Sequence, residues 1–402
     1  MAKRALIDVV VTARADLSYT LPIAAAISAQ PGLKARVVAA GDVRVKDAPK
    51  GVPVLRVRAP TLGRDVKSSG RGVGDLVAGF TRLWSEDAPA LVVLPCDRFE
   101  VLGPATAATI LNIPIAHLYG GEEDVGYSID TRIRNALTKL AHAHFVMHEA
   151  TRQRLIDMGE EDWRVMVCGA SSVAGIKPDP APFLTHARAA GLGKGPFISA
   201  TYLPLTTFRD QGLAELDAMI AALSNFSDYT IVWNSVNMDP GGDAIAKRLH
   251  ALSRKSRNQV FVESLGAKLY FSLLSSAAAM VGNSSSALLE APSFGIPAVN
   301  VGIRQTGRLG GENVIFVPGE AKAIRQALKK ALNDKVFRQR AAETPNPFAR
   351  NDSAKVVARG IAKLLKLPAA QFLIKRSVAN NPARVMGIKR SVEFPPLAMK
   401  SK

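Results

Sequence analysis

Two apolar, strand-like runs in the first half of the sequence end in polar residues that could do acid–base chemistry. Asp97 and Arg98 follow the first run, and Gly121 and Glu122 follow the second, which contains His117. In a parallel sheet the side chains beyond the strand ends face one crevice, and a Gly-Gly pair lets the backbone approach a ligand there. Carboxylates that share a crevice shift one another's pKa, as paired acid and base roles require.

Asp130 is a third carboxylate of this kind, placed just before the helical pattern at 133–141. An aspartate in that position caps a helix as readily as it acts in catalysis, and Asp97 taken alone could equally be a turn or cap residue. We interpret Asp97, Glu122 and Asp130 as catalytic candidates because they occur together, and the capping alternative stays open.

A small-residue turn in the second half is a candidate phosphate site. Asn283, Ser284, Ser285 and Ser286 follow an apolar run and precede a helical pattern. The backbone N–H groups at a helix N-terminus, with three hydroxyls beside them, suit a phosphate anion. Glu290 follows about one and a half helical turns later, where it could reach a ribose diol. An ordinary serine-capped helix is the alternative.

Three more pairs of polar residues follow expected strands, and we assign them to substrate binding: Arg14 and Asp16, Asn237 and Asp239, and Arg304 and Arg308. Arginine forks bind diphosphates and carboxylates through two parallel hydrogen bonds. Turns of this composition are also common on protein surfaces, so each pair alone is consistent with a simple turn.

Several common types of site are missing from the sequence. There is no GxGxxG and no GxxxxGK[ST] motif, which argues against nicotinamide-dependent redox chemistry and nucleoside triphosphate hydrolysis. The histidines and cysteines show no zinc-ligand spacing. We interpret His142, His144 and His148 as structural residues, and Cys96 and Cys168 as buried free thiols. We expect neither a metal nor another cofactor.

Short β-rich runs alternate with helical patterns through both halves, which is typical of doubly wound parallel sheets. In the first half, strands are expected at 7–12, 35–40, 54–56, 91–94, 115–118, 144–147 and 165–167, with helices at 20–29, 74–87, 102–111, 130–141 and 149–158. In the second half, strands are expected at 197–200, 230–233, 260–262, 278–281, 298–301 and 314–317, with helices at 213–222, 245–252 and 265–276. The predicted fold class is α/β, with two Rossmann-like doubly wound domains.

A proline-rich stretch that begins at Lys177 interrupts the pattern and marks the expected domain boundary. We expect an N-terminal domain at 1–178 and a C-terminal domain at 179–366, closed by a helix at 353–365. The remainder, 367–402, lacks periodicity and is expected to be a basic, flexible tail. Contact of this tail with an anionic partner or a membrane surface is the alternative.

The formal net charge of +18 comes from Lys and Arg dispersed along 402 residues. A small phosphate-bearing substrate accounts for it as well as nucleic acid does. No apolar run approaches the ~20 residues of a membrane span, and no secretory pattern precedes the first strand. We therefore expect no nucleic-acid partner, no stable membrane insertion and a cytoplasmic location.

Five motifs, in this order, resemble the UDP-N-acetylglucosamine 2-epimerases, and specifically the hydrolysing branch of sialic-acid-type sugar biosynthesis. The likeness runs from about Val9 to Val317. The motifs are Asp97 to Glu100, His117 to Glu122, Ile133-Arg134 to Phe145, Gly282 to Ser286 with Glu290-Ala-Pro, and Arg304 to Arg308.

The resemblance implies a glycosyltransferase-B-like fold, an active site in the interdomain cleft, a UDP-sugar substrate and a homodimer. It implies roles for Asp97, Glu122 and Asp130 around the sugar, for Arg14 and Ser284 to Ser286 at the diphosphate, and for Glu290 at the ribose. In that family a carboxylate removes the C2 proton while UDP leaves C1. Water then adds at C1, and C2 is reprotonated from the other face.

Two departures from the family pattern affect the expected substrate. Leu203 stands where the family has a histidine that contacts the diphosphate, and one residue is inserted between Gly126 and Asp130. The expected activity is that of a UDP-hydrolysing 2-epimerase acting on UDP-N-acetylglucosamine or a related UDP-2-acetamido sugar, including 4-acetamido-6-deoxy variants. The alternatives are a non-hydrolysing 2-epimerase, a glycosyltransferase-B-type glycosyltransferase and a non-catalytic nucleotide-sugar binder.

Overall fold

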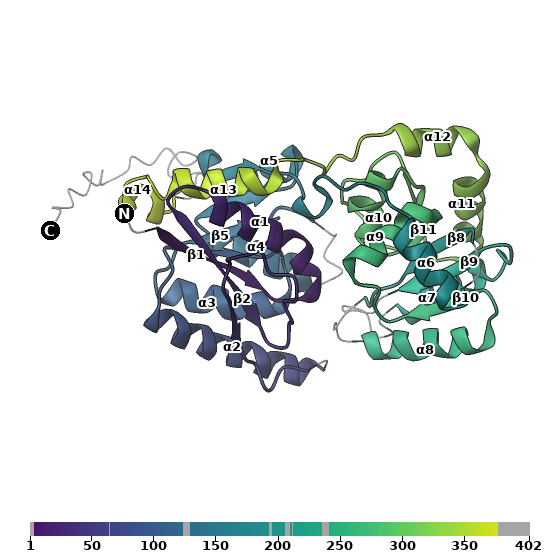
Figure 1. Cartoon of the computed structure of the whole chain (residues 1–402), viewed down its shortest axis with the longest axis horizontal. Helices are drawn as coiled ribbons and strands as arrows, with labels where there is room; N and C mark the ends of the chain where they lie inside the picture. Colours follow the sequence, from purple (N-terminus) through teal and green to yellow (C-terminus); the bar gives the residue numbers. More distant parts are fainter. Residues whose placement is uncertain are drawn as a thin grey trace, which may run out of the picture.

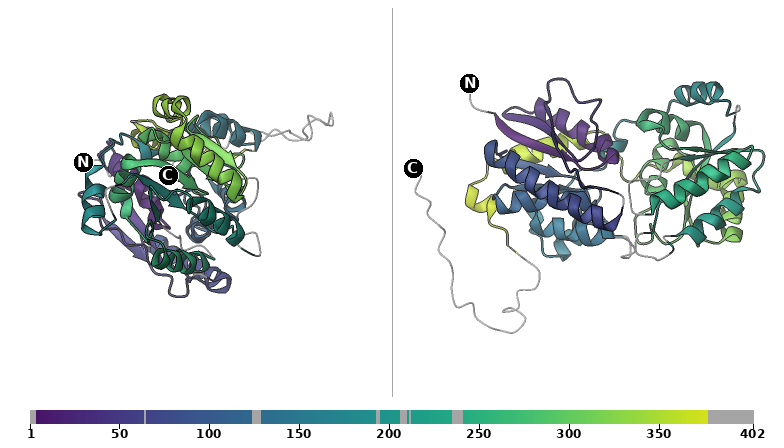
Figure 2. Two further views of the ribbon diagram at one scale, coloured as in Figure 1. Left: turned by 90° about the vertical axis from the view of Figure 1, so that its right-hand side faces the viewer. Right: turned by 90° about the horizontal axis from the view of Figure 1, so that it is seen from below.

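Two parallel sheets, each packed with helices, form two lobes that lie side by side (Figure 1). The computed structural model of the chain describes residues 4–63, 65–123, 129–192, 195–205, 210, 212–234 and 241–376. The views in Figure 2 show the same two lobes from the end and from below. Each lobe has the strand order of a Rossmann-like domain, as the following paragraphs describe.

The first sheet has seven strands in the order β3-β2-β1-β4-β5-β6-β7. Its strands are β1 (Ala5–Val11), β2 (Leu33–Ala40), β3 (Val54–Val57), β4 (Leu91–Leu94), β5 (Ile115–Leu118), β6 (Ala143–Val146) and β7 (Val165–Val167). The chain starts at the centre, winds outward to β3, and returns to extend the other edge from β4. This reversal beside β1 is the place where doubly wound sheets bind ligands.

Helices connect these strands: α1 (Leu17–Ala29), α2 (Val66–Glu86), α3 (Leu102–Ile110), α4 (Ile129–Leu140) and α5 (Glu149–Asp157). Short 3-10 turns lie at η1 (Arg14–Asp16), η2 (Phe99–Val101), η3 (Asp162–Arg164) and η4 (Ser171–Val173). Alternate strand residues enter different cores, since Val9 packs in the cluster that contains α1 and Val10 in the cluster that contains α2 and α3. Both faces of the sheet are therefore buried, which requires continuous apolar strands.

The second sheet has six strands in the order β10-β9-β8-β11-β12-β13. Its strands are β8 (Phe197–Thr201), β9 (Thr230–Asn234), β10 (Gln259–Val262), β11 (Ala277–Gly282), β12 (Ala298–Val301) and β13 (Val314–Val317). Its helices are α6 (Ala181–Ala189), α7 (Leu213–Leu223), α8 (Gly242–Lys255), α9 (Gly266–Ser276), α10 (Ser286–Leu289), η5 (Ala291–Phe294), α11 (Ala321–Asn333) and α12 (Lys335–Glu343). The predicted pair of Rossmann-like domains is thus confirmed.

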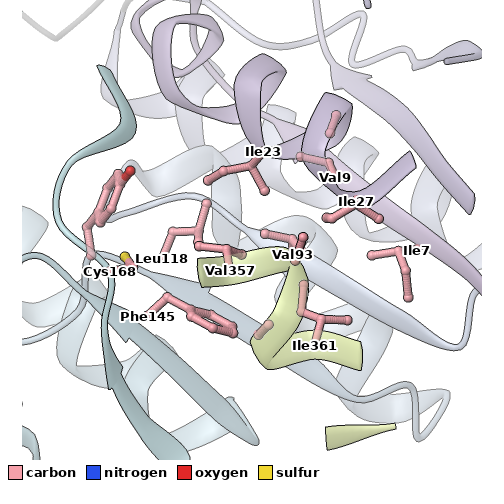
Figure 3. Close-up of a cluster of buried hydrophobic side chains, with 14 of the residues drawn as sticks. Ile7, Val9, Ile23, Ile27, Val93, Leu118, Phe145, Cys168, Val357 and Ile361 are labelled. Carbon is pink, nitrogen blue, oxygen red and sulfur yellow. The ribbon is translucent and has the colours of Figure 1, made fainter. Parts of the chain in front are cut away.

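The last two helices, α13 (Ser353–Leu364) and α14 (Ala369–Leu373), pack against the first sheet rather than the second. Val357 and Ile361 of α13 point into the core around Ile7, Val93 and Phe145 (Figure 3). The division that placed 353–366 with the second domain is therefore corrected. The described part of the expected tail, up to residue 376, includes the buried Phe372; residues 377–402 lie outside the described part of the chain.

The sequence also missed the start of α2, which begins eight residues before the expected 74. Asp65 caps this helix, because its carboxylate accepts hydrogen bonds from the backbone of Lys67 and Ser68. Glycines in the first turns lower helix propensity and hid the pattern. Among the described residues, none of the helices combines the length and apolar character that a membrane crossing would need.

We expect Ile361→Ala to lower the free energy of unfolding by about 2–5 kcal/mol, because it leaves a cavity in the first domain's core. Val336→Ala, on the exposed face of α12, is the matched control and should change it by less than about 0.5 kcal/mol. Chemical denaturation followed by circular dichroism measures both. Equal effects of the two changes would contradict the packing of α13 on the first sheet.

Candidate functional site

Arg134 of α4 connects the segments that follow β4 and β5. Its guanidinium donates to the carboxylate of Asp97 through Nε at 3.0 Å and also through a terminal nitrogen, and it donates to the backbone oxygen of Glu122. The Arg134 side chain is fully buried, and those of Asp97 and Glu122 are 14% and 5% exposed. Two of the residues predicted to be catalytic therefore contact one arginine, which the sequence analysis named within a motif but gave no role.

Arg308 adds a second positive charge from the second domain. Burial alone would raise the pKa of Asp97, but the charges of Arg134 and Arg308 outweigh it and lower that pKa to about 2. Burial would also raise the pKa of Glu122, while the His148 hydrogen bond and the Arg308 charge lower it. Both carboxyl groups are therefore ionised at neutral pH.

His148, interpreted from the sequence as structural, contacts Glu122 directly. Its Nε2 lies 2.9 Å from Oε1 of Glu122, and its ring lies edge-on to Phe348 with 5.4 Å between the ring centres. His148 is the N-cap residue of α5, so its backbone is held at the start of that helix. A histidine that follows a buried strand was the available signal, because strand ends line the ligand crevice in such sheets.

The glycine pair passes close to other parts of the protein. A Cβ on Gly121, whose φ is +82°, would lie 2.6 Å from the carbonyl oxygen of Thr151. A Cβ on Gly120 would lie 2.9 Å from Nδ1 of His117. The turn thus passes close to α5 and to His117. A side chain at Gly120 or Gly121 would displace the turn and Glu122 with it.

His117, a predicted substrate contact, has no exposed surface. Its Nε2 lies 2.7 Å from the carbonyl oxygen of Cys96, and burial lowers its pKa to about 3, so the ring is neutral. This placement joins the end of β5 to the segment after β4. His117 therefore supports the turn that carries Asp97.

Of the two candidate residues after β1, Asp16 is buried and Arg14 is exposed. Asp16 is buried, and one of its oxygens accepts hydrogen bonds from Thr12 and Ala13 while the other accepts from Tyr19. Its carboxylate therefore shapes the loop after β1. Arg14, in the same loop, is exposed.

Two further candidates near these strands have definite places. Arg98 forms an ion pair with Glu100 at 3.2 Å. Asp130 lies in the first turn of α4, four residues before Arg134, so the two side chains project from one face of the helix. Asn237 and Asp239 lie outside the described residues.

In the second domain, Asn283 fixes the backbone that Leu203 occupies. The Asn283 amide accepts from the Leu203 N–H at 2.7 Å and donates to the Leu203 carbonyl at 2.8 Å. Arg304 and Gln305 donate to the Asn283 carbonyl at 3.2 and 3.0 Å. The family's histidine position is thus a buried leucine whose backbone is held in a fixed turn.

The helix expected after the serine turn is one turn long, since α10 spans only Ser286–Leu289. Pro292 follows within the next 3-10 turn, where it prevents a longer helix. Ser286 is buried, and its hydroxyl contacts the hydroxyl of Tyr270 and the carboxyl group of Glu290. Ser284 and Ser285 are partly exposed, so the accessible polar groups are fewer than the sequence suggested.

Glu290 has an environment unlike that of the other acids. Burial raises its pKa to about 7, although a hydrogen bond from Ser286 opposes this. A carboxyl group of this kind can accept or donate a hydrogen bond near neutral pH. No cluster of His, Cys, Asp and Glu among the described residues is arranged to hold a metal ion.

Comparisons with known proteins agree with this arrangement. A family model described as UDP-N-acetylglucosamine 2-epimerase matches residues 27–362. The chain is 34% identical over 266 residues to the GDP/UDP-N,N'-diacetylbacillosamine 2-epimerase (hydrolyzing) of Campylobacter jejuni, which covers 65% of this chain and 68% of that protein. It is 33% identical over 273 residues to the UDP-N,N'-diacetylbacillosamine 2-epimerase (hydrolyzing) of Legionella pneumophila, which covers 66% of this chain and 70% of that protein.

Solved structures with the same fold include the UDP-GlcNAc 2-epimerase of Neisseria meningitidis bound to UDP-GlcNAc. It superposes with a TM-score of 0.74 at 14% identity and covers 89% of this chain and 100% of that one. The UDP co-structure of S. aureus MnaA gives a TM-score of 0.71 at 15% identity, covering 91% and 98%. The glycosyltransferase-B-like arrangement of the two domains is thereby confirmed.

We expect Glu290→Gln to remove a pH dependence of stability. The native pKa of Glu290 is about 7, above the ordinary 4.5. The free energy of unfolding therefore falls as the pH rises from 4.5 to 7, and above pH 7 this group no longer changes it. At pH 8 the glutamine variant should be more stable by up to about 3 kcal/mol, and near pH 4.5 the gain should vanish. Denaturant titrations at several pH values measure this. A gain that is equal at pH 5 and pH 8 would argue against the raised pKa.

Proposed function

The chain belongs to the UDP-N-acetylglucosamine 2-epimerase family, and we propose on this premise that it is a UDP-hydrolysing 2-epimerase acting on a UDP-2-acetamido sugar. The observation that carries the proposal is the arrangement around Arg134, which binds the carboxylate of Asp97 and the backbone oxygen of Glu122, with the charge of Arg308 acting on both carboxyl groups. The hydrolysing activity in the names of both diacetylbacillosamine relatives supports it.

In the proposed reaction a carboxylate removes the proton at C2 of the sugar, with Asp97 as the base. The C2–H electron pair becomes the C1=C2 double bond while the C1–O bond breaks, and UDP departs with that bond's electrons. Water then adds to the double bond: its oxygen bonds to C1, one of its protons passes to a carboxylate, and an acid delivers a proton to C2 from the opposite face. Asp130 is the candidate for that acid, and the ionised Glu122 is the candidate base that takes the proton from water.

Arg308 links substrate binding to the strength of the base. Its charge lowers the pKa of Asp97 and of Glu122, and a carboxylate with a pKa near 2 is a weak base. Among the described residues, the buried Nε of Arg308 has no hydrogen-bond partner, so it is available to a ligand. When a diphosphate forms an ion pair with the Arg308 guanidinium, the positive charge acting on Asp97 is reduced. The pKa of Asp97 then rises, and Asp97 becomes a better base.

The leaving diphosphate needs positive charge as its own negative charge develops. We assign this role to Arg308 and Arg304, and we assign Ser284 and Ser285 to the same group on their partial exposure. Leu203 contributes only its backbone to the turn through Asn283. The substitution of leucine for histidine therefore leaves the arginines as the cationic part of this site.

The substrate is proposed as UDP-N,N'-diacetylbacillosamine or UDP-N-acetylglucosamine. The first carries two acetamido groups and is named for the relatives at 33–34% identity, whereas a Neisseria meningitidis UDP-N-acetylglucosamine 2-epimerase is 28% identical. The hydrolysing relatives favour this reaction over the non-hydrolysing and glycosyltransferase alternatives. The homodimer and the cytoplasmic location stay predictions.

We expect both UDP-sugars, tested separately in D2O, to distinguish the reactions by proton NMR. A hydrolysing 2-epimerase releases free UDP and a free 2-epimer that carries deuterium at C2. Asp97→Asn should lower the rate by about a hundredfold to ten-thousandfold because it removes the base. Asp228→Asn, in an exposed turn before β9, is the matched control and should leave the rate unchanged. Retention of UDP on the epimerised sugar, or C2 without deuterium, would contradict the proposal.

We expect His148→Phe to shift the acidic limb of the kcat/KM profile to higher pH. The hydrogen bond from His148 lowers the pKa of Glu122, so its loss raises that pKa, and the ionised form is lost at a higher pH. His148→Gln retains a donor amide and should shift the limb less. Identical profiles for the wild type and both variants would exclude this role for His148.

A further inference from the structure

The C-terminal end of α4 is capped by a lysine from the far end of the described chain. The last four carbonyl groups of an α-helix lack partners within the helix and must find them elsewhere. Nζ of Lys375 donates to the carbonyl oxygens of Thr138 at 2.7 Å and Lys139 at 3.1 Å. The first of these contacts spans 237 residues of sequence. A positive charge at this end of a helix also opposes the negative end of its dipole.

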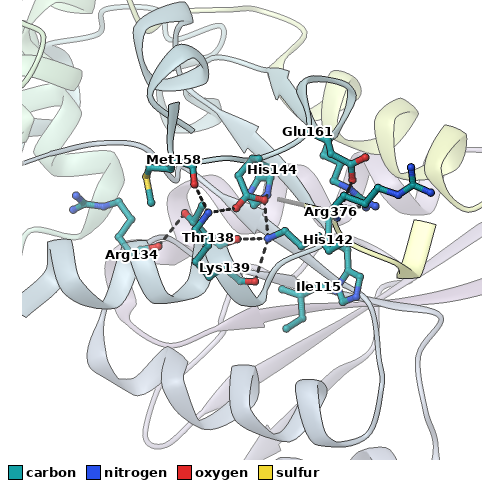
Figure 4. Close-up of polar contacts among 12 residues, drawn as sticks. Ile115, Arg134, Thr138, Lys139, His142, His144, Met158, Glu161 and Arg376 are labelled. Carbon is teal, nitrogen blue, oxygen red and sulfur yellow. Dashed lines mark hydrogen bonds and ion pairs between the residues drawn. The ribbon is translucent and has the colours of Figure 1, made fainter. Parts of the chain in front are cut away.

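Glu160 supplies the counter-charge that allows this lysine to be half buried. Oε2 of Glu160 lies 2.7 Å from Nζ of Lys375, so the three protons of the ammonium group have three acceptors. The Glu160 side chain is 1% exposed and also binds Lys139 at 2.9 Å and Nε2 of His144 at 3.1 Å. Figure 4 shows the polar contacts around Thr138, Lys139 and His144.

The segment that carries Lys375 is itself fixed in place. The buried guanidinium of Arg164 donates to the carbonyl oxygens of Gln371, Phe372 and Ile374 at 2.8 to 3.1 Å. The backbone N–H of Arg376 donates to Glu161 at 3.4 Å. Lys375 therefore approaches α4 from a rigid anchor, and not from a free chain end.

The middle of α4 carries Arg134, which contacts the site. Arg134 lies one turn before Thr138, and the hydroxyl of Thr138 donates to the Arg134 carbonyl at 3.1 Å. From that turn the Arg134 side chain reaches Asp97 and the backbone of Glu122. A helix transmits a shift along its axis because its turns are hydrogen-bonded to one another. A rotation or slide of α4 would move the Arg134 guanidinium relative to both carboxylates.

We propose that Lys375 is a positioning residue for the reaction. By capping α4 from the C-terminal segment, it fixes the helix that carries Arg134 and hence the orientation of Asp97 and Glu122. The proposal rests on the proposed function for the roles of these two carboxylates. Lys375 caps the C-terminal end of α4, one turn beyond Arg134, and acts through the helix.

The test compares Lys375→Met, Lys375→Arg and Arg376→Ala in the full-length protein. Methionine keeps the length of the side chain without its charge, and arginine restores a donor. In the described part of the chain the Arg376 side chain makes neither a hydrogen bond nor an ion pair, so Arg376→Ala is the matched loss of one positive charge. The measured quantities are kcat, KM, the dissociation constant of UDP, and amide hydrogen exchange in residues 129–140.

We expect Lys375→Met to lower kcat about tenfold, within the range of long-range coupling measured in proteins. KM and UDP affinity should change less than about twofold, since the groups assigned to UDP belong to the second domain and the C2 step is the one affected. Exchange in α4 should become faster. Lys375→Arg should recover most of kcat, and Arg376→Ala should match the wild type.

Two results would overturn the proposal. One is a kcat for Lys375→Met within twofold of the wild type, and the other is an equal loss of kcat and UDP affinity, which indicates general destabilisation. If the wild type turns over neither UDP-sugar, the proposed function fails first. Hydrogen exchange then tests the capping of α4 by Lys375 separately. If exchange in α4 is the same in Lys375→Met as in the wild type, the proposal is overturned.

Discussion

The buried guanidinium of Arg134 is the interaction on which the arrangement of the first domain's polar residues depends. Removing a charge from water costs several kcal/mol, and only close, well-oriented partners offset that cost. These partners come from two different strand ends, the Asp97 carboxylate after β4 and the Glu122 carbonyl after β5. The sheet register, the start of α4 and both turns must therefore agree before the arginine can be buried. His117 and the two glycines of the second turn help to keep those strand ends in place.

The charge of Arg134 stabilises the buried Asp97 carboxylate but also makes it a weaker base. A carboxylate neutralised by arginines is stable in a buried place but binds protons weakly. Arg308 comes from the other domain, and in the proposed function it is the group that forms an ion pair with the diphosphate. Under that proposal, the positive charge around Asp97 is divided between Arg134, which stays bound to it, and Arg308, which binds the substrate, so that Asp97 is stably buried and also reactive with bound substrate.

The strands were predictable because both faces of each sheet are buried and the strands are apolar throughout, so their ranges follow from composition alone. The grouping of Asp97 and Glu122 followed from the rule that parallel strand ends share an edge. Arg134 was not predictable, since an arginine within an amphipathic helix has the same sequence pattern as one on a solvated face. The place of α13 was also hidden, because its apolar stripe indicates that it packs on a sheet but not on which one. The helix α10 is limited to a single turn because Pro292 follows it and prevents its continuation.

The return of α13 and α14 to the first sheet has a consequence for synthesis on the ribosome. Chains emerge at about 5–20 residues per second, and N-terminal domains usually fold first. Here the core around Ile7, Val93 and Phe145 needs Val357 and Ile361, which follow the whole second domain. At those rates the first domain waits about 10–40 seconds after its seventh strand has been made before its last helix arrives. Its exposed apolar face during that interval is a surface for chaperones, and the second domain can finish folding before the first.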